Sequence, residues 1–150
     1  MQERFETFTV LINRISRDIR KIKNQEMADY HLRSVHVSCL YYVYSLGSVT
    51  SAELCEHCEE DKATISRAVD YLETNGFLLR DTGAKRYKSP LLLTEKGRDA
   101  GKRIAEKIGS ILETVSHALT ENERIEFYRC LSTISRSLEA IVQNNEEKEM

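Results

Sequence analysis

The sequence has little proline, no tryptophan and no long apolar run. Its 150 residues include one proline, Pro90, and no tryptophan. No apolar run approaches the roughly 20 residues of a membrane-spanning helix, and the N-terminal residues lack the apolar core of a signal peptide. We therefore expect a cytoplasmic protein with no membrane partner, in which all four cysteines are reduced thiols.

The sequence also lacks the motifs that accompany catalysis and cofactor binding. It has only six glycines, and none of them belongs to a phosphate-binding loop. It contains neither a nucleophile elbow nor a paired-acid motif. We therefore expect a protein that is not an enzyme, with no catalytic residues, no cofactor and no metal.

The charge balance does not indicate a generally basic protein. The 22 Lys and Arg residues stand against 24 Asp and Glu residues, which leaves a net charge of −2. Because small nucleic-acid-binding domains are usually basic, any attraction to phosphate must come from a local patch. The 41% of hydrophobic residues is enough to form a core, and the length suits one domain.

Apolar residues at spacings of three and four predict six helices. Their starts are predicted from capping residues, some of them followed by a glutamate three positions later. These caps are Ser34, Thr50, Asp61, Thr94 and Thr120. The apolar stripe of the first helix is Phe5, Phe8, Ile12, Ile15, Ile19 and Ile22, and that of the sixth is Phe127, Leu131, Ile134, Leu138 and Ile141.

Two short apolar runs, residues 77–81 and 89–93, predict a β-hairpin. Pro90 indicates that the second strand lies at a sheet edge, because proline cannot donate a backbone hydrogen bond. The hairpin follows a helix-turn-helix pattern, so we expect a mostly α fold with a small β-wing, a winged helix-turn-helix with long N- and C-terminal helices. The wing carries a group of cations, Lys85, Arg86 and Lys88.

The predicted fourth helix, residues 61–74, has the pattern of a helix that enters the major groove of DNA. Its apolar residues share one face, while small and hydroxyl-bearing side chains and one arginine lie on the other. Small side chains allow close approach, hydroxyls reach phosphates or base edges, and arginine can bind guanine O6 and N7. The alternative is an ordinary amphipathic helix with a wet polar face, but the basic wing favours DNA binding. The candidate DNA-binding residues are Lys62, Ala63, Thr64, Ser66 and Arg67.

Three segments, residues 50–55, 61–77 and 91–97, resemble the MarR family of winged-helix regulators. The resemblance implies a homodimer that binds a pseudo-palindromic operator in double-stranded DNA. The fourth helix would lie in the major groove and the wing in the minor groove, within a lobe of residues 34–99. Residues 1–33 and 100–144 would form the dimer, and residues 145–150 would be a frayed tail. The resemblance further implies a repressor that responds to a ligand or to stress.

The two apolar stripes support the dimer independently. A small winged lobe cannot easily cover both stripes, and a second chain would bury them. The alternative is that they pack on each other within one chain. A twofold axis would also supply two recognition helices at the spacing of the DNA helical repeat.

Other residues leave two alternatives open. Cys39, Tyr41 and Tyr44 lie on one predicted helix and are candidates for a small-molecule effector pocket, although packed core positions would show the same pattern.

Two neighbouring thiols suggest a metal or thiol sensor of the same fold. The residues of such a sensor would be Cys39, His31 and His36, or Cys55 with Cys58. The net negative charge, with Glu59 and Glu60 beside the predicted DNA face, suggests a winged-helix protein-interaction module without DNA binding.

Overall fold

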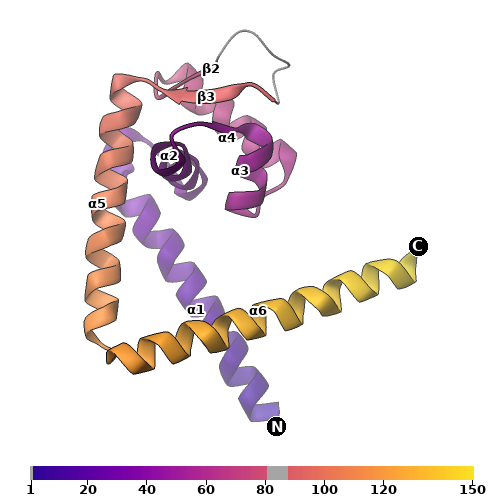
Figure 1. The fold of residues 1–150 in the computed structure, drawn as a ribbon. Coiled ribbons are helices and arrows are strands. Elements are labelled where there is room, and N and C mark those ends of the chain that lie inside the picture. Colours follow the sequence, from indigo (N-terminus) through magenta and orange to yellow (C-terminus); the bar gives the residue numbers. More distant parts are fainter. Residues whose placement is uncertain (1, 81–87) are drawn as a thin grey trace. The chain divides into compact units, whose positions relative to one another are not determined.

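Six α-helices, one short 3-10 helix and three strands make up the computed structural model, which describes residues 2–80 and 88–150 (Figure 1). The expected fold class, mostly α with a small β-wing, is confirmed. The chain divides into two compact units, residues 1–107 and 108–150, and each is described by itself. The elements are α1 (Gln2–Glu26), η1 (Ala28–Tyr30), α2 (Ser34–Leu46), β1 (Val49–Thr50), α3 (Ser51–Cys58), α4 (Lys62–Thr74), β2 (Leu78–Arg80), β3 (Pro90–Leu93), α5 (Glu95–His117) and α6 (Glu121–Glu149).

Most of the helices begin at the residues that the sequence predicts. The Thr50 hydroxyl accepts a hydrogen bond from the Glu53 backbone N–H, and the Glu53 carboxylate accepts one from the Thr50 N–H at 2.8 Å. Thr120 begins α6 with the same reciprocal pair. Asp61 begins α4 by accepting from the Thr64 N–H at 2.7 Å. These bonds satisfy backbone donors that have no partner inside the helix.

The predicted start of α2 at Ser34 is wrong by one residue. Arg33 is the residue that precedes the helix, and its backbone N–H donates to Nδ1 of His36 at 3.0 Å. The imidazole thus plays the part that a glutamate or glutamine plays in a capping box. The helix ends at Gly47 as predicted, where φ is +81°, a left-handed value that glycine adopts without steric cost.

The predicted hairpin forms, but it belongs to a three-stranded antiparallel sheet with the order β1-β3-β2. The two-residue strand β1 pairs with β3, with Thr50 opposite Pro90. The prediction that Pro90 marks an edge strand is therefore wrong, since β3 is central. Pro90 is the first residue of β3, a position where the absence of a backbone N–H is tolerated.

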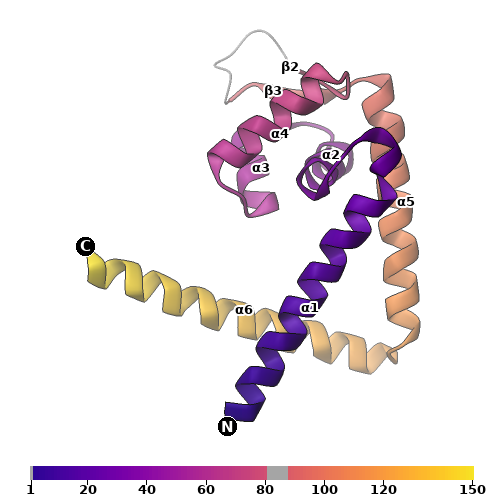
Figure 2. The ribbon, with the colours of Figure 1, turned by 180° about the vertical axis from the view of Figure 1, so that it is seen from behind.

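The core of residues 1–107 surrounds α2, which contacts α1, α3, α4, β1 and β3. Helix α4 packs against both α2 and α3 (Figure 2). The start of α5 packs closely on the same core. A Cβ atom at Gly97 would lie 1.9 Å from the carbonyl oxygen of Phe77, so only glycine fits there. The largest fully buried side chains include Leu40, Leu54, Ile65, Leu72, Phe77 and Leu91.

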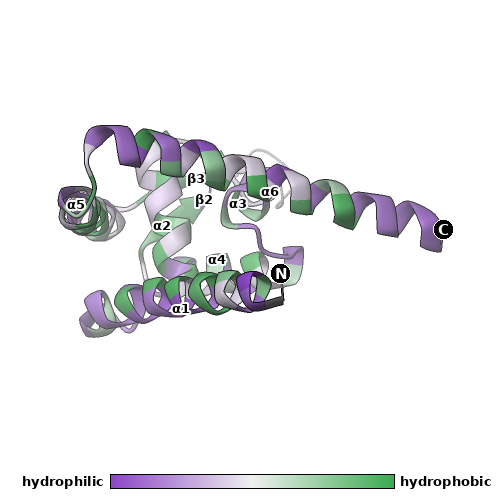
Figure 3. Ribbon diagram, turned by 90° about the horizontal axis from the view of Figure 1, so that it is seen from below, coloured by the Kyte–Doolittle hydropathy of each residue, from purple (hydrophilic) through white to green (hydrophobic). Residues whose placement is uncertain are grey.

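Helix α6 differs from the core helices, because this helix, which the structure describes throughout, contains no buried residue. Hydrophobic and hydrophilic residues alternate along both α1 and α6 (Figure 3). Helix α6 extends to Glu149, and so includes most of the segment 145–150 for which the sequence predicts a frayed tail. The polar residues of this last segment are mostly glutamate and lysine, which favour helix. Among the described helices, none combines the length and apolar character needed to cross a bilayer.

Candidate nucleic-acid interface

Helix α4 separates its residues between core and solvent as the sequence predicts. Ile65, Val69 and Leu72 are fully buried. Three of the candidate DNA-binding residues, Lys62, Ala63 and Arg67, are exposed, and the other two, Thr64 and Ser66, are half-buried. All five lie in the first half of the helix, so one short surface presents two cations, two hydroxyls and a methyl group.

The N-terminus of α4 carries a negative charge as well as the positive ones. The Asp61 carboxylate accepts the Thr64 N–H, and the hydrogen bonds from Thr64 hold the pKa of Asp61 below its usual value, with a smaller effect from the positive charge of Arg67. Glu59 and Glu60, which are exposed, precede it. A phosphate close to this end of the helix would therefore meet carboxylates, and the cations Lys62 and Arg67 would have to offset them.

Arg80, in the strand β2 beside the wing, is bound within the protein. Its Nε donates to the Glu73 carboxylate, and its Nη2 lies 3.7 Å from Oδ1 of Asp70. Only 14% of its side chain is exposed. Since Asp70 and Glu73 belong to α4 and Arg80 to β2, these ion pairs attach β2 to α4. Sequence reasoning missed this role because nothing in the local pattern pairs residues on different elements.

The three wing candidates fall in two groups. Lys85 and Arg86 lie outside the described residues. Lys88 is exposed and directly precedes the buried Ser89, which leads into β3. The described part of the wing therefore offers one lysine to solvent beside the sheet.

The three effector candidates differ in burial, and one of them, Tyr44, lines a described pocket. Cys39 is fully buried, whereas Tyr41 is half-buried. Tyr44 lines a pocket of about 490 Å³ with residues of β3 and α5, including Leu92, Arg98 and Lys102. Neither Cys39 nor Tyr41 is among the described residues that line it.

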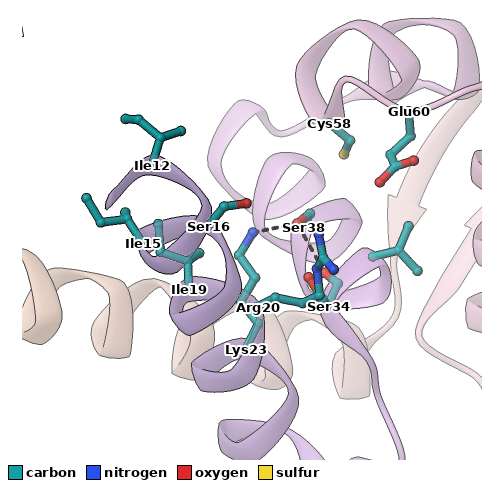
Figure 4. Close-up of a pocket in the computed structure, with 11 residues that line it drawn as sticks. Ile12, Ile15, Ser16, Ile19, Arg20, Lys23, Ser34, Ser38, Cys58 and Glu60 are labelled. Carbon is teal, nitrogen blue, oxygen red and sulfur yellow. Dashed lines mark hydrogen bonds between the residues drawn. The ribbon is translucent and has the colours of Figure 1, made fainter. Parts of the chain in front are cut away.

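A second pocket of about 330 Å³, which sequence reasoning did not identify, lies between α1, α2 and the turn after α3 (Figure 4). Its floor and walls combine isoleucines with two cations and a thiol. The Lys23 ammonium donates to the Ser38 hydroxyl at 3.0 Å across this space. The lining residues are Ile12, Ile15, Ser16, Ile19, Arg20, Lys23, Ser34, Val35, Ser38, Cys58 and Glu60.

The histidines named as candidate metal ligands have other contacts. The ring of His36 stacks on Tyr71 of α4, with 4.4 Å between the ring centroids. Burial lowers the pKa of His36, and the nearby Arg33 lowers it further. His31 is exposed, and its carbonyl accepts from the Tyr71 hydroxyl at 2.9 Å. Over residues 2–80 and 88–150, no group of three His, Cys, Asp or Glu side chains could hold a metal ion.

Part of this lobe is similar to a known protein family. Residues 32–83 match the model of the MarR family. The curated relative YwoH of Bacillus subtilis, an uncharacterized HTH-type transcriptional regulator, is 28% identical over 85 residues. That match covers 57% of this chain and 62% of the length of YwoH. The MarR family model thus matches the helix-turn-helix part of this chain.

Solved structures of MarR family proteins have the same fold along most of the chain. NMB1585, a MarR family regulator from Neisseria meningitidis, superposes with a TM-score of 0.81 at 20% identity, over 95% of this chain and 98% of its own. The MepR–DNA complex from Staphylococcus aureus gives a TM-score of 0.77 at 18% identity, over 87% of this chain and 97% of its own. The segment matched by the MarR family model contains all of α4 and β2, and thus every candidate residue of the recognition helix.

Proposed function

We propose that this chain is a homodimeric transcriptional regulator that binds a pseudo-palindromic site in double-stranded DNA. The observation that carries the proposal is the exposure of Lys62, Ala63 and Arg67 at the start of α4, on a helix whose opposite face is fully buried. A helix anchored in this way can approach a groove without disturbing the core. The DNA complex of MepR, a protein with the same fold, supports this choice of partner.

The side chains of the recognition helix have different roles in the proposal. Arg67 reads a base, because a guanidinium can donate two hydrogen bonds to guanine O6 and N7. Thr64 and Ser66 reach phosphates or base edges through their hydroxyls. Lys62 contacts phosphate, which adds affinity but no sequence preference. In the wing, Lys85, Arg86 and Lys88 contact the minor groove and its flanking phosphates.

The dimer in this proposal accounts for apolar surface that one copy leaves in water. In α6, Phe127, Leu138 and Ile141 are about half exposed, and in α1 Ile15 and Ile19 are exposed to a similar degree. Monomeric soluble proteins rarely leave such continuous apolar surface uncovered. A second copy would cover it, and the twofold axis would present two copies of α4 to successive turns of one DNA groove.

We further propose that an effector or a stress signal releases the protein from DNA, as expected of a repressor. A ligand can do this only if it binds the DNA-free conformation more tightly, and the difference is a coupling free energy. The pocket lined by Arg20 and Lys23 suits a small anionic organic molecule, because these two cations outnumber the one carboxylate in its lining, that of Glu60, and its isoleucines provide apolar contact. The pocket at Tyr44, with Arg98 and Lys102, is a second place for such a ligand.

A protein-interaction module without DNA binding is the second candidate function. The exposed Glu59 and Glu60 beside α4, together with the net charge of −2, favour it. Under the DNA-binding proposal, the same carboxylates weaken the attraction to phosphate. They therefore predict a modest affinity that falls steeply as salt is added.

Fluorescence anisotropy with the duplex upstream of the protein's own gene separates the two functions. We expect tighter binding to this duplex than to a scrambled duplex of equal length, and an affinity that falls as salt rises. The Glu59→Gln/Glu60→Gln double variant should bind both duplexes more tightly, because two like charges are removed. Equal affinity for both duplexes at every salt concentration would contradict the proposed regulator and favour the protein-interaction module.

A further inference from the structure

Tyr71 joins α4 to the segment that connects α1 with α2. It lies in the second half of α4 and is half-buried. Its ring stacks on the imidazole of His36, with 4.4 Å between the ring centroids and an interplanar angle of 16°. Its hydroxyl donates to the carbonyl oxygen of His31 at 2.9 Å. One side chain of α4 therefore contacts two residues on either side of the point where α2 begins.

Both partners of Tyr71 are held in place by further hydrogen bonds. The backbone N–H of His31 donates to the carbonyl of Ala28 at 2.9 Å, which closes a turn before α2. Nδ1 of His36 accepts from the Arg33 N–H at 3.0 Å. Burial and the charge of Arg33 lower the pKa of His36, so this nitrogen stays unprotonated and able to accept. Tyr71 thus contacts groups whose positions are already fixed.

The ion pairs of Arg80 hold the same half of α4 from a different element. Asp70 and Glu73, which flank Tyr71 in the sequence, pair with Arg80 of β2. These pairs attach α4 to the sheet, whereas Tyr71 attaches it to the start of α2. Attachments to two different elements restrict both the tilt of α4 and its rotation about its own axis.

Arg67, the residue proposed to read a base, lies one helical turn before Tyr71. The two are four positions apart, so they share one side of α4, and Arg67 is exposed. A small tilt or rotation of α4 would move the guanidinium of Arg67 relative to a base edge. Two hydrogen bonds to guanine O6 and N7 require both donors in line. A displaced α4 would therefore lose discrimination between bases before it loses attraction to phosphate.

We propose that Tyr71 is a positioning residue of the recognition helix, which sets through His31 and His36 the angle at which Arg67 meets a base edge. Tyr71 acts through Arg67 and leaves the attraction to phosphate to the cations of α4 and of the wing. The inference rests on the proposed DNA-binding function. It predicts that loss of either contact of Tyr71 lowers sequence discrimination and leaves the affinity for unrelated DNA unchanged.

Two conservative variants of the full chain remove one contact each. Tyr71→Phe loses the hydroxyl and keeps the ring, whereas His36→Gln loses the stack and keeps an acceptor for the Arg33 N–H. The probes are the duplex upstream of the protein's own gene and the same duplex changed at the base pair where Arg67→Ala loses discrimination. We expect the affinity ratio of these duplexes to fall about fivefold in Tyr71→Phe, as for one hydrogen bond, and about threefold in His36→Gln. Affinity for a scrambled duplex should not change.

Combination with Arg67→Ala distinguishes positioning from a merely structural role. If Tyr71 acts through Arg67, then Tyr71→Phe should cause no further loss of discrimination at that base pair once Arg67 is removed. The matched control is Tyr42→Phe on α2, because the Tyr42 ring also stacks on a histidine, His57 of α3, at 5.0 Å. This control should keep the native ratio. A native ratio in Tyr71→Phe, or losses that add fully in the double variant, would overturn the proposal.

Hydrogen exchange without DNA separates this inference from the proposed function. In Tyr71→Phe, amides in the second half of α4 should exchange about fivefold faster, because the bond to His31 is lost. Tyr42→Phe should leave these rates unchanged, and native rates in Tyr71→Phe would overturn the attachment of α4. If the native protein binds no duplex better than a scrambled one, the proposed function is contradicted and the positioning role fails with it. The exchange rates would still decide whether Tyr71 holds α4.

Discussion

Hydrophobic side chains serve different purposes in the helix-turn-helix lobe and in α6. In the lobe, Leu54, Leu72 and Leu91 have no exposed surface. In α6, Leu138 is 48% exposed and Ile141 is 56% exposed. The residue types are alike, and both regions have regular helical spacing, so the sequence pattern alone does not distinguish them.

This difference in exposure indicates that the buried residues of the lobe stabilise the fold of one chain, whereas the exposed residues of α6 contribute to the association of two chains. The core of the lobe is complete within one copy of the chain, so its folding should not depend on protein concentration. No residue of α6 is buried in one copy of the chain. The apolar stripe of α6 should therefore add to stability only when two copies associate. The lobe would then provide the DNA-binding surface, while α6 would set the distance between two such surfaces.

Truncation of Leu72 should have the largest effect on the lobe. We expect Leu72→Ala to lower the free energy of unfolding by about 2–5 kcal/mol, because it removes buried methyl groups and leaves a cavity. Urea denaturation at several protein concentrations measures this loss, which should be the same at each concentration. A loss that shrinks as the protein concentration rises would show that the lobe core is not complete within one chain.

A charge on the α6 stripe should affect assembly instead. We expect Leu138→Glu to weaken association by about 2 kcal/mol or more, since it places a carboxylate in a buried apolar contact. Light scattering should then give the mass of one 17.3 kDa chain, whereas the proposed native dimer should give twice that mass. The matched variant Glu139→Gln, also on α6 and exposed, should remain dimeric. An unchanged mass for Leu138→Glu would contradict the assignment of this stripe to the dimer.

Loss of the Arg80 ion pairs should have a moderate effect on the lobe. We expect Arg80→Met to lower the free energy of unfolding by about 1.5 kcal/mol, near the lower end for hydrogen bonds to charged groups, because Glu73 remains partly exposed. DNA binding should weaken as well, since the wing strand loses its attachment to α4. Lys88→Met, at the exposed end of the wing, is the control and should leave stability unchanged.

The smallest expected effect is a pH dependence from His36. Its pKa is lowered by burial and by Arg33, so below about pH 6.5 the unfolded chain binds a proton that the folded chain resists. His36 therefore contributes stability that is complete above that pH and is lost as the pH falls through its folded pKa. His36→Gln, whose side chain can also accept from the Arg33 N–H, should remove this dependence, whereas His57→Gln should keep it. Urea midpoints between pH 7.5 and 5 measure the difference.

Local patterns predicted much of this fold because their physical causes are local. Thr50, Asp61 and Thr120 cap helices through bonds to residues three positions away, and such spacing is visible in a sequence. The buried face of α4 follows from helical periodicity in the same way. The start of α2 was misplaced because the bond from Arg33 to an imidazole is a rare form of capping box.

Features that depend on contacts between distant residues were not predicted. Strand β1 has only two residues, too few for a periodic pattern, and it exists because β3 supplies its hydrogen bonds. The same pairing places Pro90 in a central strand. The binding of Arg80 to α4 likewise arises from packing between elements. The spacing of residues along the chain does not predict such contacts.

The central claim is that the exposed start of α4 reads DNA sequence, and the Arg67→Ala variant tests it most directly. Its affinity should be measured for the native operator and for a set of duplexes with one base pair changed at a time. We predict a loss of about 1–3 kcal/mol on the operator and relaxed discrimination at one base position. Lys85→Ala should instead weaken binding to every duplex alike and reduce the salt dependence. Unchanged discrimination at every position in Arg67→Ala would contradict the account.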